Sequence, residues 1–280
     1  VRDSHPGPIP DTLPTGCNEN LTSLKVVLDT VGETNFQECY NDALFYRDTL
    51  REEFHHGQAT LRERGLGENY YLAVLQKIAD ILPGVNRVPP ELENLPELMS
   101  DIYYGNFSLF QSLPDVWAID QLFPIMPIHR LREEPRRSAV LADLTCDCDG
   151  KIDLFTAPDG ASRTLKLHPL NPGEDYYLGA FLVGAYQETL GDLHNLFGDT
   201  NVVNVAVNPD GSFEFVREFH GDSISDVLRY VEYDPKQMQE QFRRVAEDAV
   251  RDGKISIAQR QAILRAFRDS LHGYTYFEHD

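Results

Sequence analysis

Residues 176–186 read YYLGAFLVGAY, and this stretch is the main sign that the middle of the chain forms strands. The run is almost entirely apolar and includes two glycines, Gly179 and Gly184. A continuous apolar run is typical of a strand that is buried on both faces, and glycine within a strand marks a bulge or the close approach of another backbone. We therefore expect a buried strand over residues 176–186.

The sequence on either side of this run has the alternation of further strands. Residues 140–144 and 203–207 carry apolar side chains at every second position, which is the period of a strand. The sequence NPDG at residues 208–211 is a strong turn signal, and Phe213 and Phe215 continue the alternation beyond it. The middle third of the chain is therefore predicted to be rich in strands.

Helical patterns precede this region. Thr34 and Gln37 have the spacing of a capping box, in which two side chains satisfy the first free amides of a helix. Apolar side chains then recur at helical spacing as far as the sequence PG at residues 83–84. We expect antiparallel helices over residues 34–82. They would pack through six large side chains, namely Phe36, Tyr40, Leu44, Tyr71, Leu75 and Ile78.

The two ends of the chain differ in composition and in the spacing of their apolar residues. Residues 1–20 are rich in Pro, Gly and Asn and predict a loop, and the short apolar run at residues 24–28 favours a strand. Residues 224–271 have helical apolar stripes. Ser256 and Gln259 have the spacing of a second capping box within that region. The end of the chain is therefore predicted to be helical.

Composition narrows the classes of function. The chain has 280 residues, a formal net charge of −20 and 41% hydrophobic residues, as a globular protein would. The negative charge argues against nucleic acid and anionic membrane as partners and is compatible with a cationic substrate. No apolar run approaches the roughly 20 residues that cross a bilayer. The four cysteines form no disulfide framework, so we expect reduced thiols in a cytoplasmic protein.

The sequence TCDCDG at residues 145–150 follows the alternating strand and concentrates reactive groups. Thiolates and carboxylates bind metal ions, but Cys-x-Cys has no second Cys/His pair at zinc-finger spacing here. A polar turn with small buried thiols is the interpretation that spacing alone favours. The third interpretation is an active-site loop presented at the end of a strand.

Several longer stretches identify a family. They read DIYYGNFSLFQSLPD at residues 101–115, WAIDQLFPIMPIHRL at 117–131, YLGAFLVGAYQE at 177–188 and GDLHNLFG at 191–198. With ECYNDA at residues 38–43 and YVEYDP at 230–235, they resemble the biosynthetic arginine decarboxylases. The resemblance extends from about residue 30 to the end of the chain.

The resemblance implies an α+β fold of the fold-type III pyridoxal-phosphate decarboxylases. This family pairs a (β/α)8 barrel with a β-domain of sandwich or barrel-like form, and the arginine branch inserts a helical bundle. The barrel, which carries the cofactor lysine, is expected to be missing here, because none of the six lysines has a matching context. The first residue is not Met, as expected of a chain cut from a longer one.

Four regions are therefore expected. They are a loop and strand at residues 1–33, the inserted helical bundle at 34–100, the β-domain at 101–220 and the C-terminal helices at 221–280.

The resemblance also assigns residues to the reaction, which converts L-arginine to agmatine and carbon dioxide in polyamine biosynthesis. Cys146 matches a catalytic cysteine that enters the active site from a partner subunit, so a homo-oligomer with shared active sites is implied. Asp147 matches a carboxylate that meets the far end of the substrate, and Asp149 is a second substrate-binding candidate. Tyr186 matches a tyrosine beside the cofactor. The family also depends on Mg²⁺, for which the sequence identifies no site.

Other residues have simpler interpretations. Phe107 stands where ornithine-specific relatives carry an aspartate, which favours a different substrate, and Cys148 stands where the family commonly has Ser. A hydrogen-bonded structural role is the more common one for His129 and His194, and Asp120 is equally well a turn or cap residue.

Two alternative functions remain open. One is a decarboxylase of the same fold that acts on ornithine or diaminopimelate. The other is a non-catalytic, decarboxylase-like binding or regulatory protein, since a chain without the barrel would lack the cofactor lysine.

Overall fold

The computed structural model describes residues 4–158 and 160–278. The chain forms two compact units, and each is built from three segments. The first unit comprises Val1–Tyr103, Met126–Val140 and Asp153–Gly179. The second comprises Tyr104–Ile125, Leu141–Ile152 and Ala180–Asp280.

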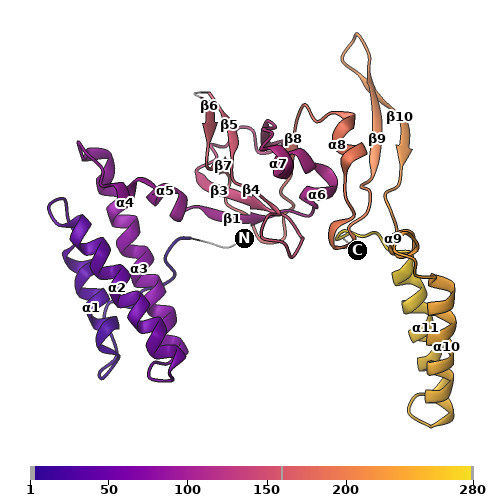
Figure 1. The fold of residues 1–280 in the computed structure, drawn as a ribbon, viewed down its shortest axis with the longest axis horizontal. Coiled ribbons are helices and arrows are strands. Elements are labelled where there is room, and N and C mark those ends of the chain that lie inside the picture. The colour runs from indigo at the N-terminus through magenta and orange to yellow at the C-terminus, as the bar shows by residue number, and fades with distance from the viewer. Residues whose placement is uncertain (1–3, 159, 279–280) are drawn as a thin grey trace. The chain divides into compact units, whose positions relative to one another are not determined.

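A bundle of three helices dominates the first unit: α1 (Glu19–Thr30), α2 (Phe36–His55) and α3 (Leu61–Ile81) (Figure 1). Each helix packs against the other two. The strand predicted at residues 24–28 is wrong, because this segment lies within α1. Leu21, Leu24 and Val27 recur at three-residue spacing and bury one face of a helix against the bundle.

The predicted antiparallel helices over residues 34–82 are confirmed, but the expected capping box at their start is wrong. The N-cap of α2 is Asn35, and no side chain caps the helix there. The Oδ1 atom of Asn35 instead accepts a hydrogen bond from the amide of Gly32, at 2.8 Å. The capping box of the bundle is at α3, where Thr60 and Glu63 satisfy each other's amides.

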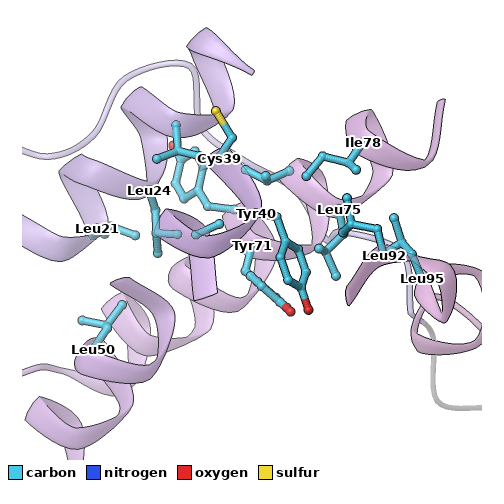
Figure 2. Packing of buried hydrophobic residues seen from close by; sticks show 14 of the residues in the cluster. Leu21, Leu24, Cys39, Tyr40, Leu50, Tyr71, Leu75, Ile78, Leu92 and Leu95 are labelled. Atoms are coloured by element: carbon cyan, nitrogen blue, oxygen red, sulfur yellow. The ribbon is translucent and has the colours of Figure 1, made fainter. Parts of the chain in front are cut away.

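The core of the bundle matches the predicted stripes. Tyr40 is 9% exposed, and the side chains expected on α3 are 7% exposed or less; Phe36 and Leu44 pack against the core as partly buried residues. A one-turn 3-10 helix (Leu82–Gly84) and two short helices, α4 (Pro90–Glu93) and α5 (Leu95–Leu98), follow α3. Figure 2 shows Leu92 and Leu95 beside Leu75, so these short helices close one end of the core.

The strands are short. A four-stranded sheet has the order β1 (Asp101–Tyr104), β3 (Arg137–Ala142), β4 (Lys151–Ile152), with β7 (Leu165–Leu167) also paired to β3. The remaining strands form two-stranded sheets: β2 (Ile125–Pro127) with β8 (Leu178–Ala180), β5 (Phe155–Ala157) with β6 (Gly160–Ser162), and β9 (Val202–Val207) with β10 (Phe213–Phe219).

The buried strand predicted over residues 176–186 is wrong in extent and in burial. Only Leu178–Ala180 form a strand, and Leu182 has a left-handed backbone (φ 61°) that ends any extended run. The side chain of Leu182 is 85% exposed and that of Phe181 is 43% exposed. Helix α8 (Ala185–Leu190) begins directly after Gly184. The apolar run is therefore a surface segment in this chain.

The predicted hairpin at residues 203–215 is confirmed. β9 and β10 are antiparallel, with Phe213 opposite Val207 and Phe215 opposite Val205. Gly211 has a φ of 84° in the turn, a conformation that other residues rarely adopt. Two short helices, α6 (Leu109–Ser112) and α7 (Pro114–Ile119), and a 3-10 turn, η2 (His194–Leu196), also belong to the second unit.

The C-terminal region is helical, as predicted. It contains α9 (Ile224–Tyr230), α10 (Pro235–Arg251) and α11 (Ile257–Leu271), and Figure 1 shows α10 and α11 as a hairpin. The capping box of Ser256 and Gln259 is present at the start of α11. The rings of Phe242 and Phe267 stack with centroids 4.3 Å apart, which joins the two helices.

The fold is α+β, with a helical bundle and C-terminal helices. Residues 4–158 and 160–278 form no (β/α)8 barrel. Within the same residues, no helix combines the length and apolar character that crossing a membrane requires.

Candidate active-site loop

The TCDCDG sequence forms a closed loop in the second unit. It leaves the end of β3 at Ala142 and returns to the sheet at Lys151, the first residue of β4. The amide of Asp143 donates to the carbonyl of Gly150 at 2.8 Å, so the two ends of the loop meet. The loop therefore connects two paired strands, as the active-site interpretation expects.

Asp143 holds the base of the loop and is only 4% exposed. Its Oδ2 atom accepts a hydrogen bond from the amide of Leu109 at 2.8 Å. Its Oδ1 atom accepts from the amide of Thr145 at 2.8 Å and from the hydroxyl of Thr145 at 2.7 Å. A carboxylate that satisfies three donors from two segments fixes the loop against the start of α6.

Gly150 is needed where the loop closes around this carboxylate. A Cβ atom at residue 150 would lie 2.2 Å from Oδ1 of Asp143 and 2.4 Å from the hydroxyl oxygen of Thr145. Both distances are far shorter than real contacts, so only glycine fits without moving the carboxylate.

The tip of the loop is organised by Asp147. Its Oδ1 atom accepts from the amide of Asp149 at 2.9 Å, and its carbonyl accepts from the amide of Gly150 at 3.2 Å. This is the local turn that aspartate favours. Its other carboxylate oxygen, Oδ2, lies 3.4 Å from Nε2 of His194. The carboxylate is thus oriented by contacts on both oxygens while its side chain stays 35% exposed.

Cys146 is exposed and contacts the turn that follows α8. The side-chain amide of Asn195 donates to Sγ of Cys146 at 3.1 Å. His194 lies with its ring centroid 4.3 Å from that of Phe110 in α6, and Phe110 in turn packs against Trp117. Two adjacent residues of the turn therefore contact two adjacent residues of the loop.

The structure tests the two other interpretations of the loop. The polar turn with buried thiols is wrong as stated, because Cys146 and Cys148 are both exposed. Ligand atoms of Asp147, Cys148 and Asp149 lie within 4.8 Å of one another, the one such group among the residues that the structure describes. Exposed acidic clusters are common without a metal ion, so this geometry alone identifies no metal site.

The predicted site residues divide into two groups. Cys146, Asp147 and Asp149 lie together on the loop. Tyr186 lies on α8 in the same unit, with its side chain 76% exposed. Their roles in substrate and cofactor binding stay predictions.

Two residues that hold the loop, Asp143 and Asn195, could not be predicted from the spacing of residues in the sequence. Asp143 follows Ala139 and Leu141 on the face that the structure buries, whereas the alternation predicted over residues 140–144 placed it on the opposite face. A carboxylate at such a position must be satisfied inside the protein. No local pattern links Asn195 to Cys146, because the two are 49 residues apart and only the fold brings them together.

The residues expected to be structural are placed as follows. Nε2 of His129 accepts a hydrogen bond from the amide of Tyr177 at 3.1 Å, which confirms a structural role. Asp120 is the left-handed C-cap of α7, so the cap interpretation is confirmed. The carbonyl of Phe107 accepts from the amide of Leu144 at 3.0 Å, which places residue 107 beside the base of the loop.

Comparison with known proteins gives the family. Residues 18–96 match the model of the arginine decarboxylase helical bundle domain, and residues 224–277 match that of the arginine decarboxylase C-terminal helical extension. The chain is 49% identical over 247 residues to a biosynthetic arginine decarboxylase of Nostoc sp., which covers 88% of this chain and 36% of that protein. It is 43% identical over 261 residues to one of Bacteroides thetaiotaomicron, covering 93% of this chain and 41% of the relative.

A solved structure agrees with these sequences. The crystal structure of a biosynthetic arginine decarboxylase from Campylobacter jejuni superposes with a TM-score of 0.78 at 29% identity. The match covers 98% of this chain and 44% of the Campylobacter chain. The fold is thus that of part of a decarboxylase, with a helical bundle and a C-terminal helical extension. The chain belongs to the arginine decarboxylase family, and it spans less than half the length of the relatives that it matches.

Proposed function

We propose that this chain is the part of an arginine decarboxylase that supplies the loop of Cys146 and Asp147 to the active site. The reaction would convert L-arginine to agmatine and carbon dioxide. One observation carries the proposal: a thiol and a carboxylate stand side by side on a loop held at its base, each with its own polar contact. The chain that presents them is 42–49% identical to biosynthetic arginine decarboxylases.

The residues of this chain fit part of a pyridoxal-phosphate site. A lysine that binds the cofactor covalently needs a free, partly desolvated amine. Four of the six lysine amines contact oxygen atoms, namely those of Lys25, Lys77, Lys166 and Lys254. None of the six lysines has a sequence context that resembles a cofactor lysine, so we expect that lysine to come from residues outside this chain. The side chain of Tyr186 on α8 is exposed, so this chain could contact the cofactor through it.

Bound pyridoxal phosphate would supply an electron sink for the charge left when carbon dioxide departs. Cys146 would then direct a proton to the α-carbon of the substrate rather than to the cofactor. Its exposure and the hydrogen bond to Sγ suit this role, because the thiol is accessible and has a fixed neighbour.

Asp147 would bind the guanidinium of arginine. One carboxylate can accept two parallel N–H bonds from a guanidinium, a charge-assisted geometry that an amine cannot reproduce. The carboxylate is oriented and remains partly exposed, so an incoming cation can reach it. Asp149, exposed two residues further on, is the second candidate. Phe107 lies beside the base of the loop, at the position where ornithine-specific relatives carry an aspartate. A carboxylate there would favour a substrate that ends in an amine.

The proposal includes an assembly. Exposed Cys146 and Tyr186 are available to a second subunit, so we propose a homo-oligomer with shared active sites. A reducing, cytoplasmic setting suits four free cysteines, of which Cys146 must stay reduced to act. The resemblance also implies a dependence on Mg²⁺, which is part of the proposal.

The test is a substrate panel with the full-length protein. Release of carbon dioxide is measured from arginine, ornithine, lysine and diaminopimelate, with and without Asp147→Asn. We expect arginine to give the highest kcat/KM, and Asp147→Asn to raise KM for arginine by about tenfold or more, because a charge-assisted pairing is worth roughly 1.5–3 kcal/mol. Preference for ornithine or diaminopimelate would refute the substrate. Turnover of no substrate would favour the non-catalytic alternative.

A further inference from the structure

We propose that His194 and Asn195 are positioning residues that hold Asp147 and Cys146 in their working orientations. Both residues lie in η2. From the sequence we expected only a structural role for His194 and no role for Asn195. The inference rests on the proposed function, because His194 would position the substrate-binding Asp147 and Asn195 would position the catalytic Cys146. The four side chains all belong to the second unit.

Asn195 acts on the thiol. Its Nδ2 atom is 3.1 Å from Sγ of Cys146, and an amide N–H can only donate in this contact. Cys146 is exposed, so without this contact its sulfur could occupy any of the staggered rotamers that the backbone allows. The donor selects one orientation of the sulfur.

His194 acts on the carboxylate. Nε2 lies 3.4 Å from Oδ2 of Asp147, and the imidazole ring packs against the ring of Phe110. The amide of Asp149 occupies Oδ1 of the same carboxylate. The plane of the carboxylate is therefore defined from both sides, which is what bidentate recognition of a planar cation requires.

The backbone of η2 supports a functional interpretation. Asn195 and Leu196 have φ values of 57° and 63°, so two consecutive residues that are not glycine adopt the left-handed conformation. Left-handed backbone costs free energy for most residues and is concentrated at functional sites. Asparagine tolerates this conformation better than most residues, and it directs the side chain of residue 195 at Cys146.

Matched variants separate the side-chain contacts from the backbone. Asn195→Gly keeps the left-handed backbone and removes the amide donor, while Asn195→Asp keeps the size and replaces the donor by an acceptor. His194→Phe keeps a ring on Phe110 and removes Nε2. Leu196→Asn is the control, because it suits the same backbone and changes a side chain that is 45% exposed.

The first measurement is amide hydrogen exchange in this chain without cofactor or substrate. We expect Asn195→Gly, Asn195→Asp and His194→Phe to accelerate exchange of residues 145–150 by roughly threefold to tenfold, the range that the loss of one hydrogen bond or ion pair allows. Exchange in α10 and α11 should be unchanged, and Leu196→Asn should leave residues 145–150 unchanged. Unchanged exchange of the loop in the first three variants, or acceleration in all helices alike, would overturn the proposal.

The second measurement is kinetics of the same variants in the full-length protein. Asn195→Gly should lower kcat and increase the share of cofactor-inactivating misprotonation, with KM for arginine within about twofold. His194→Phe should raise KM by about threefold or more with kcat little changed. Equal changes in kcat and KM for both variants would refute separate roles. If the wild-type protein does not decarboxylate arginine, the proposed function fails, and the exchange measurement still decides whether η2 holds the loop.

Discussion

Asp143→Asn is the substitution that most directly tests how the loop is held. The side chain is 4% exposed, and its two oxygens satisfy three donors from Leu109 and Thr145. An amide of the same size keeps one oxygen and puts an NH2 group in place of the other. That NH2 group would face either the amide of Leu109 or the two donors of Thr145, so one side of the network must lose its acceptor.

The magnitude follows from this geometry. A hydrogen bond to a charged group contributes roughly 1.5–3 kcal/mol, and a buried donor left without a partner costs a further penalty of similar size. Leu109 is fully buried, so water cannot replace the lost acceptor. We therefore expect Asp143→Asn to lower the free energy of unfolding of the second unit by about 2–4 kcal/mol.

The chain offers its own reporter and control for this measurement. Trp117, the single tryptophan, lies in α7 of the second unit, so its fluorescence follows this unit in urea. With a urea slope of about 2 kcal/mol/M, the midpoint should fall by about 1–2 M. Asp149→Asn, on the exposed side of the loop, should change stability by less than about 0.5 kcal/mol. Equal midpoints for Asp143→Asn and the wild type would refute the role given to Asp143.

Two further predictions concern the helical bundle. Gly67→Ala should destabilise the bundle by about 1–3 kcal/mol in thermal unfolding followed by circular dichroism, because the new Cβ would lie 2.4 Å from Cδ2 of Leu50. Gly65→Ala on the same helix is the control: its Cβ meets no atom within 4 Å, so it should be neutral or stabilising by up to about 1 kcal/mol. Equal effects of the two substitutions would refute the close packing at Gly67. Hydrogen bonds from the backbone and hydroxyl of Thr60 lower the pKa of Glu63 below its ordinary 4.5, so this cap should stabilise the bundle above that pH and lose its contribution as pH falls through the lowered pKa. Glu63→Gln should therefore be less stable than the wild type at pH 6, with a difference that shrinks below pH 4.5, and a difference independent of pH would contradict this.

The sequence predicted those elements whose signals are local. The helices over residues 34–82, the turn at 208–211 and the capping box of Ser256 depend on residues close together in the chain, and all are present. The strand predicted at residues 24–28 is wrong. The local preference of Val26 and Val27 favours a strand, but packing of α1 against α2 and α3 buries side chains at three-residue spacing and outweighs that preference.

The long-range features escaped prediction. Residues 176–186 are apolar enough for a buried strand, but burial depends on what covers them, and in this chain most of the run is exposed. Cys146 and Asp147 were predicted through a family resemblance. Their contacts with His194 and Asn195 join residues far apart in the sequence, and no local pattern encodes such a pairing.

The central claim, that the loop of Cys146 and Asp147 works in arginine decarboxylation, is tested most directly by comparing Cys146→Ala with Cys148→Ser in the full-length protein. Both cysteines are exposed and two residues apart, and only Cys146 is proposed to act on the proton. Turnover of arginine and the share of cofactor-inactivating misprotonation are measured together. We expect Cys146→Ala to lower turnover and raise that share, and Cys148→Ser to stay within about twofold of the wild type. A Cys148→Ser variant as damaged as Cys146→Ala would contradict the assignment of the loop.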